Sequence, residues 1–272
     1  MSSIDIGIDW DDWFENGGYI TGGADFPAKW ARDAAAFRGR ARGLIDHPYG
    51  PAKRQVLDLF EPTQAPQGLV VFVHGGYWLR FDKSYWSHLA TGALSRGWAV
   101  AIPSYTLAPE ARIGAIVGEI AWAIAAAAER IAGPVRLTGH SAGGQLVSRM
   151  ACENAPLDDD TAGRIDRVIS ISGVHDLRQL QLTKMNETLH LDAAEALSES
   201  PALLQPRTDL AVTAWVGAME RPEFLRQTRM LEEAWSMEGA QIRAVYERDR
   251  HHFDVINGLA EPGSPLISAL LD

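Results

Sequence analysis

A serine between glycines is the strongest chemical signal in the sequence. Residues 139–143 read "GHSAG", which places Ser141 in the pattern G-x-S-x-G. The apolar run "PVRLTG" ends at the first of these glycines, and the helical stretch "AGGQLVSRMACEN" follows the serine. A nucleophilic serine in a strained turn between strand and helix needs small neighbours, because larger side chains would clash there. The pattern therefore predicts that Ser141 is a nucleophile and that the amide of Ala142 faces the reacting atom.

A pair of glycines follows another apolar run, where "LVVFV" leads into "HGGYW". Two consecutive glycines can adopt backbone conformations that leave amide N–H groups pointing into a cavity. We expect the amides of Gly75, Gly76 and Tyr77 to join that of Ala142 in an oxyanion hole. The alternative is an ordinary glycine-assisted turn from strand to loop, capped by His74.

A serine hydroxyl is a weak nucleophile and needs a base to take its proton and an acid to orient that base. In the serine hydrolases that carry this turn, the acid and then the histidine follow the serine along the chain. The histidines after Ser141 are His175, His190, His251 and His252. His251 and His252 follow the last strand-like run, "IRAVYER", and are the expected candidates. His175 precedes any suitable acid, and His190 lies in a polar helical region.

The acid should come at the end of the strand before the histidine. Glu220 follows the apolar run "LAVTAWVG" and fits that position. Glu223 falls within the helix that Pro222 should begin, and Asp249 lies close to the histidines but out of order. A structural salt bridge is the alternative role for each of these carboxylates.

Composition points to small-molecule chemistry. The chain has 272 residues, 46% of them hydrophobic, and a formal net charge of −10. This charge argues against nucleic acid or an anionic membrane as a partner. The first residues do not read as a secretory signal, so we expect a cytoplasmic protein. We expect the single cysteine, Cys152, to be buried in the core with an unreactive thiol. We expect no metal and no cofactor, because no metal-spaced cluster of His and Cys is visible.

The elements that must position these residues alternate between strands and helices. Strand-like runs lie at 54–60, 68–76, 98–105, 134–139, 167–173, 210–217 and 242–248, and the longest helical stretches at 84–95, 110–132 and 142–154. The first run alternates apolar and polar residues and predicts an exposed or edge strand. This order predicts an α/β fold with a mostly parallel central sheet and helices on both faces. In such sheets ligands bind at the carboxyl ends of the strands, where the candidate residues lie.

The motifs together resemble a known family. In order along the chain they read "HGGYW", "GHSAGG", "ISGVHDL", "VGAMERPEFLRQ" and "HHFDVI". They are similar to the arylformamidase (kynurenine formamidase) branch of the α/β-hydrolases, over nearly the whole chain. The resemblance implies a single α/β-hydrolase domain over 1–272, with 1–50 as an N-terminal access or lid segment. It also implies hydrolysis of an N-formyl arylamine, typically N-formyl-L-kynurenine to L-kynurenine and formate, in tryptophan degradation.

The resemblance also assigns roles. Ser141 is then the nucleophile, and His252, directly before Phe253, is the base. Glu220 takes the acid position, where many relatives have an aspartate.

A formyl group is small, so the leaving arylamine should need a flat apolar slot. Tyr49, Tyr77 and Trp78 are the candidates to line it, with core or lid packing as the alternative. Arg80 is the nearest cation in sequence for a substrate carboxylate.

Other functions use the same residues. A broad short-acyl carboxylesterase or thioesterase would need only a different leaving group. A non-catalytic binding module on the same fold is a further alternative, which an intact set of Ser, His, acid and glycines disfavours. We expect an aromatic formamide or ester as the partner molecule, no nucleic acid or membrane partner, and a homodimer as an open possibility.

Overall fold

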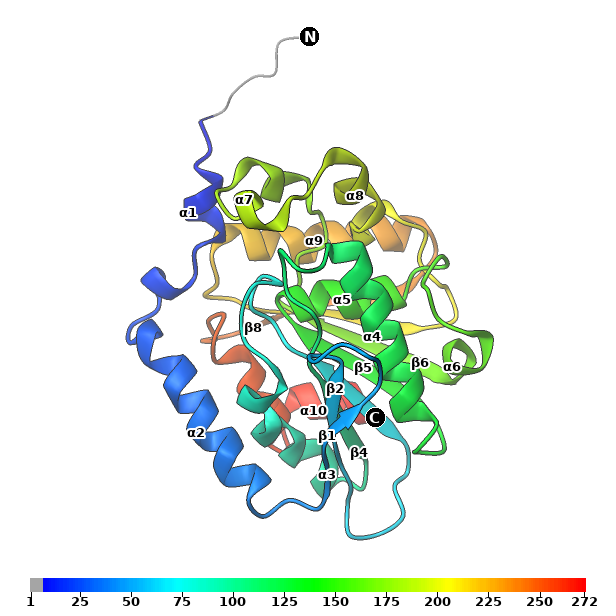
Figure 1. Cartoon of the computed structure of the whole chain (residues 1–272). Coiled ribbons are helices and arrows are strands. Elements are labelled where there is room, and N and C mark those ends of the chain that lie inside the picture. The colour runs from blue at the N-terminus through cyan, green and yellow to red at the C-terminus, as the bar shows by residue number, and fades with distance from the viewer. Residues whose placement is uncertain (1–6) are drawn as a thin grey trace.

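A computed structural model describes residues 7–272 of the chain (Figure 1). The first six residues of the predicted lid segment lie outside the described residues. Within the described part, eight strands form one sheet in the order β1-β2-β4-β3-β5-β6-β7-β8. The strands are β1 (Gly43–Pro48), β2 (Val56–Phe60), β3 (Leu69–Val73), β4 (Ala99–Pro103), β5 (Val135–His140), β6 (Ile165–Ile171), β7 (Ala211–Gly217) and β8 (Gln241–Glu247).

Helices connect the strands. The α-helices are α1 (Trp10–Phe14), α2 (Phe26–Arg38), α3 (Thr91–Ser95), α4 (Ile113–Ala128), α5 (Ala142–Met150), α6 (Asp159–Arg164), α7 (Asn186–Leu189), α8 (Ala193–Ser198), α9 (Pro222–Met237) and α10 (Pro265–Leu271). Short 3-10 helices are η1 (Gly17–Tyr19), η2 (Gly23–Asp25), η3 (Lys83–Tyr85), η4 (Ser87–Ala90), η5 (Arg178–Leu182), η6 (Pro201–Leu203) and η7 (Val255–Ala260). No helix within 7–272 is long and apolar enough to cross a membrane.

The sheet is mostly parallel, as predicted. From β4 to β8 every neighbouring pair is parallel, and only β1 with β2 and β2 with β4 are antiparallel. The fold is that of an α/β-hydrolase. The carboxyl ends of β3, β5, β6, β7 and β8 therefore lie along one edge of the sheet, where the chain leaves each strand.

Two apolar layers cover the two faces. Along β3, Val71 and Val73 pack into the layer formed with α4, α5 and α9. The alternating residues Val70 and Phe72 pack into the other layer, with α2, α3 and α10. Successive strand side chains point to opposite faces, so a continuously apolar strand is what a sheet covered on both sides requires. Figure 1 shows α4 and α5 together in front of the sheet.

Two expectations about the elements were wrong. The run at 54–60 is not an edge strand, because β1 pairs with β2 and covers its outer edge. The stretch 84–95 contains η3, η4 and only the short α3 instead of one helix. The stretch is interrupted between η3 and η4 at Trp86, whose φ of −122° and ψ of −1° lie outside the α-helical region.

The N-terminal segment packs against the carboxyl edge of the sheet. Asp12 forms an ion pair with Arg221, and the guanidinium of Arg221 lies 3.7 Å from the ring centre of Tyr19. Phe14 packs edge to face on Phe224 of α9, with 6.2 Å between ring centres. These contacts hold α1 and the following loop close to the strand ends at which the candidate residues lie.

Candidate active site

Ser141 occupies a strained turn between β5 and α5. Its φ of 57° and ψ of −118° lie outside the regions that ordinary residues prefer. A Cβ on Gly139 would lie 2.2 Å from the carbonyl oxygen of Gly143, and a Cβ on Gly143 would lie 2.0 Å from that of Val73. Both glycines are therefore required by close backbone packing. This packing leaves Ser141 at the start of the helix, on the wall of a cavity.

His252 is paired with a carboxylate. Its Nδ1 lies 2.6 Å from Oε2 of Glu220, and both side chains are buried. Because a carboxylate accepts, Nδ1 carries the hydrogen and Nε2 is left as the basic nitrogen. His252 and Ser141 line the same cavity. The histidine, the acid and the serine thus come together at the ends of β8, β7 and β5.

Glu220 is fixed by two further donors. The hydroxyl of Ser172 donates to Oε1 at 2.5 Å, and the amide of Gly217 donates to the same oxygen at 2.8 Å. The carboxylate of Glu220 therefore binds Ser172 and Gly217 through Oε1 and His252 through Oε2. The sequence did not predict a role for Ser172. This residue follows β6, which lies between β5, the strand before Ser141, and β7, the strand before Glu220.

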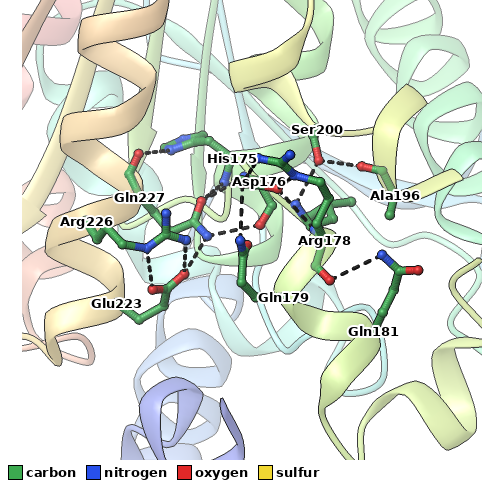
Figure 2. A network of polar contacts seen from close by, with 11 residues as sticks. His175, Asp176, Arg178, Gln179, Gln181, Ala196, Ser200, Glu223, Arg226 and Gln227 are labelled. Carbon is green, nitrogen blue, oxygen red and sulfur yellow. Dashed lines mark hydrogen bonds and ion pairs between the residues drawn. The ribbon is translucent and has the colours of Figure 1, made fainter. Parts of the chain in front are cut away.

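Glu223 has a different environment. Both of its oxygens accept from the guanidinium of Arg226 at 2.7 Å, and Gln227 donates to Oε1 at 2.7 Å. Figure 2 shows this group on α9, joined through Gln227 to the loop after β6. The amides of His175 and Asp176 in that loop both donate to Oε1 of Gln227 at 2.7 Å. Glu223 thus belongs to a structural network, the alternative role that the sequence left open.

The remaining histidines lie apart from this arrangement. His175 is buried, with Nε2 2.8 Å from the hydroxyl of Ser170 and Nδ1 donating to the carbonyl of Gln227 at 3.2 Å. His251 lies 3.3 Å from Asp254 and packs edge to face on Phe26. His190 and Asp249 are exposed. The structure therefore distinguishes His252 from His251 by the contact with Glu220.

The glycine turn after β3 has the expected open backbone. Gly76, Tyr77 and Trp78 have φ values of 115°, 54° and 58°. The amides of Gly75, Gly76 and Tyr77 donate no hydrogen bond to the described part of the chain. Gly75 lies against the nucleophile turn, where its Cβ would be 2.9 Å from that of Ser141. Ala142 begins α5, so its amide is one of those that a helix leaves without an internal acceptor.

His140 contacts His252 through both its ring and a hydrogen bond. Its Nε2 donates to the carbonyl of His252 at 2.9 Å, and the two rings lie 4.6 Å apart. Burial, with a smaller contribution from the charge on His252, holds the pKa of His140 well below its ordinary value. His140 therefore stays neutral and fixes the backbone at His252 through this hydrogen bond.

A cavity of about 400 Å³ opens beside Ser141 and His252. Its wall is rich in aromatic side chains. They come from α2, from the glycine turn and the loop that follows it, and from the loop after β8: Trp30, Tyr77, Phe81, Trp86 and Phe253. The rings of Trp30 and Trp86 lie 4.7 Å apart, and those of Trp30 and Phe253 lie 5.3 Å apart. The cavity therefore offers flat apolar surfaces next to the reactive groups.

Two of the three expected slot residues lie elsewhere. Trp78 is completely buried in the core, and its indole N–H donates to Gln145 at 3.2 Å. Tyr49 donates its hydroxyl to the carbonyl of Ser104 at 2.6 Å and lines a separate hollow beside α4. Tyr49 follows β1, the outermost strand of the sheet, and the side chain of Trp78 packs into the core instead of the cavity. Tyr77 does line it, and so does Arg80.

Within residues 7–272, no group of three or more His, Cys, Asp or Glu side chains is arranged to hold a metal ion. Cys152 is buried just after α5, where burial raises the pKa of its thiol to about 11. An uncharged buried thiol has little nucleophilic reactivity.

Comparison with known proteins decides the family. The family model described as BD-FAE matches residues 57–220, more than half of the chain. The chain belongs to the BD-FAE family. The matched BD-FAE segment runs from β2 to Glu220 and includes the glycine turn and Ser141.

Individual relatives agree with this BD-FAE assignment. The kynurenine formamidase of Danio rerio is 28% identical over 244 residues, covering 86% of this chain and 83% of its own length. The kynurenine formamidase of Drosophila melanogaster is 28% identical over 233 residues, covering 79% and 77%. The resemblance expected from the motifs is therefore confirmed, and the chain is a hydrolase of the α/β type.

Solved structures extend the comparison beyond the matched BD-FAE segment. A crystal structure from Silicibacter sp. tm1040, described as a "putative thioesterase", is 48% identical with a TM-score of 0.93 and covers 98% of this chain and 100% of that one. Esterase B from Lactobacillus Rhamnosis is 19% identical with a TM-score of 0.66, covering 86% and 87%. The second likeness concerns the fold alone.

Proposed function

We propose that this protein hydrolyses N-formyl arylamines, with N-formyl-L-kynurenine as the best substrate, to formate and the free amine. In this proposal Ser141 is the nucleophile, His252 the base and Glu220 the acid that orients it. The observation that carries the proposal is the cavity in which Ser141 and His252 face a wall of aromatic rings. The degradation of tryptophan is the corresponding process.

In the first step the hydroxyl oxygen of Ser141 attacks the formyl carbon while Nε2 of His252 takes the hydroxyl proton. The negative charge moves to the formyl oxygen, which the amides of Ala142 and of the glycine turn stabilise. Each such donor is worth about 3 kcal/mol of barrier. The carbon–nitrogen bond then breaks, and His252 gives its proton to the leaving amine nitrogen.

In the second step water attacks the formyl ester on Ser141, and His252 takes a proton from the water. The serine oxygen leaves with the proton that His252 returns, and formate is released. Glu220 orients the imidazole and stabilises the imidazolium in both steps. Ser172 and Gly217 hold the carboxylate in place, because each donates a hydrogen bond to its other oxygen.

The shape of the cavity supports an aromatic leaving group. Trp30, Trp86 and Phe253 present rings at spacings that are typical of aromatic contacts. A planar arylamine can pack against these rings, whereas a short alkyl chain would leave much of the cavity unfilled. The two kynurenine formamidases that cover most of the chain support the same substrate class.

A broad short-acyl carboxylesterase or thioesterase is the second candidate. The relative that is 48% identical and carries the name "putative thioesterase" favours it. The same serine, histidine and oxyanion donors would serve this reaction, and only the leaving group would differ.

The two candidates are separated by comparing kcat/KM on N-formyl-L-kynurenine with kcat/KM on p-nitrophenyl acetate and on an acetyl thioester. We expect the formamide to be the best of the three, and we expect Ser141→Ala to abolish all three activities. A kcat/KM on the formamide far below those on the ester and the thioester would reject the formamidase proposal.

Three further expectations accompany the proposal. We propose that residues 1–272 act as one catalytic domain, with 1–50 as its access segment. Residues from 15 to 30 support the second part, because several of them line the cavity. The cytoplasmic location and the homodimer stay predictions.

A further inference from the structure

The cavity wall carries one cationic and one anionic side chain apart from the histidines. Among the described residues that line it, Arg80 is the only lysine or arginine and Glu15 the only aspartate or glutamate. Both side chains are exposed.

Arg80 is anchored close to the glycine turn. Its amide donates to the carbonyl of Gly76 at 3.0 Å. The carbonyl of the next residue, Phe81, accepts from the guanidinium of Arg54 at 2.5 Å. The backbone at Arg80 is therefore fixed on both sides. Its own guanidinium forms no ion pair with any residue from 7 to 272, in contrast to Arg221, which is paired with Asp12.

Glu15 approaches the same turn from the N-terminal segment. Its Oε1 accepts from the amide of Gly18 at 2.9 Å, and it pairs with no cation in the described part of the chain. The neighbouring Asn16 donates to the hydroxyl of Tyr77 at 3.2 Å, and this hydroxyl donates to the carbonyl of Phe14. The loop that carries Glu15 is thus fastened to the turn that carries Arg80.

Both charges act on Tyr77. Burial is the main cause that raises the pKa of the Tyr77 hydroxyl, with Glu15 adding to the rise and Arg80 opposing it. The carboxylate and the guanidinium therefore lie within electrostatic reach of one phenol group, and all three side chains line the same cavity.

We propose that Arg80 and Glu15 bind the carboxylate and the ammonium group of an α-amino acid carried by the leaving amine. This inference rests on the proposed function and makes the site selective for zwitterionic aryl formamides. A guanidinium can bind a carboxylate through two parallel hydrogen bonds, and a carboxylate accepts from an ammonium. An acyl thioester with a polyanionic carrier would bring like charge close to Glu15 and would be disfavoured.

Four aryl formamides test this inference: N-formyl-L-kynurenine, its analogue without the amino group, its analogue without the carboxylate, and 2-formamidoacetophenone, which lacks both. We expect removal of either charged group to lower wild-type kcat/KM by about tenfold, mainly through KM. Arg80→Gln should remove the preference for the carboxylate alone, and Glu15→Gln the preference for the ammonium alone. Arg130→Gln, an exposed cation at the end of α4, is the matched control and should keep both preferences.

Equal cleavage of all four formamides by the wild type would overturn the inference and leave the formamidase proposal intact. An equal loss of kcat/KM on all four formamides in Arg80→Gln or in Glu15→Gln would also overturn it. The substituted residue would then affect the fold and not the binding of a charged group of the substrate. Cleavage of p-nitrophenyl acetate but of no formamide would reject the proposed function. In that case recognition of the charged groups can still be tested with inhibitors of ester hydrolysis. The inhibitors are L-kynurenine, its analogue without the amino group and its analogue without the carboxylate, and equal inhibition by all three overturns the inference.

Discussion

The hydroxyl of Ser172 donates a hydrogen bond of 2.5 Å to Oε1 of Glu220, the carboxylate that holds His252 through its other oxygen. Ser172 is completely buried and has a φ of 50°. A buried serine in this left-handed conformation is costly for the backbone. Together with the amide of Gly217, this hydroxyl fixes one oxygen of the Glu220 carboxylate.

Removal of this hydroxyl should slow the reaction without unfolding the protein. We expect Ser172→Ala and Ser172→Gly to lower kcat by about tenfold, because Oε1 of Glu220 loses a donor and the carboxylate gains freedom. Ser172→Gly should be at least as stable as the wild type, since glycine adopts a φ of 50° without strain. The measurements are kcat against pH and the free energy of unfolding. Unchanged kcat and pH profile in both variants would assign Ser172 a merely structural role.

The length of Glu220 should matter. Its carboxylate reaches both Ser172 and His252, so Glu220→Asp, which is shorter by one methylene, cannot keep both contacts. We expect kcat to fall about tenfold in Glu220→Asp and about 10³-fold in Glu220→Gln, which removes the charge. Steady-state kinetics on the formamide give the values. Full activity of Glu220→Gln would show that another acid serves His252.

Glu223→Gln is the matched control for the acid. Glu223 is buried and bound by Arg226 and Gln227, so the loss of its charge should lower the free energy of unfolding by about 2 kcal/mol. Its kcat should stay within about threefold of the wild type, because nothing in its surroundings touches the cavity. If Glu223→Gln were inactive and Glu220→Gln active, the assignment of the acid would be wrong.

The strand-to-helix turn at Ser141 and the mostly parallel sheet could be predicted from the sequence, because both leave local patterns in it. Gly139 and Gly143 flank Ser141 for steric reasons that any strand-to-helix turn of this kind imposes. The strands of the parallel part are continuously apolar because both of their faces are buried. The edge strand β1 could not be predicted in this way, since its side chains are mostly exposed and its pattern is weak.

The aromatic wall could not be predicted, because it depends on contacts between distant segments. Trp30 comes from α2, Trp86 from the loop after the glycine turn and Phe253 from the loop after β8. Nearness in sequence to the glycine turn is misleading here, because Trp78 is a core residue. Ser172 was missed for the same reason, since a serine at the end of a strand has no local signal that points to Glu220.

The aromatic wall should select the leaving group. We expect Trp30→Leu to lower kcat/KM on N-formyl-L-kynurenine by about tenfold, because the planar ring loses a stacking partner. The kcat/KM on ethyl acetate, measured by proton release, should change less than about threefold. Trp122→Leu is the control, since Trp122 is exposed on α4. An equal loss on both substrates in Trp30→Leu would contradict a role in selecting arylamines.

Buried histidines should make the fold sensitive to acid. Burial lowers the pKa of His175 to about 4, whereas a histidine in the unfolded chain titrates near 6.5. The unfolded state therefore binds more protons as the pH falls below 6.5, and stability is lost over the range down to about 4. His175 alone should lower the free energy of unfolding by about 2 kcal/mol between pH 7 and pH 5.

Denaturant unfolding at pH 7, 6 and 5 measures this dependence. We expect His175→Gln to weaken it and His190→Gln, which changes an exposed histidine, to leave it as in the wild type. The same pH dependence in all three proteins would exclude His175 as its source.

In the proposed mechanism His252 and Glu220 activate Ser141, and covalent labelling by a fluorophosphonate followed by peptide mapping tests this activation. We predict one adduct per chain, on the peptide that carries Ser141, and none in Ser141→Ala. We also predict that the labelling rate falls at least about 100-fold in His252→Asn and in Glu220→Gln. Folded wild-type protein that takes no label, or that takes it on a residue other than Ser141, would contradict the claim.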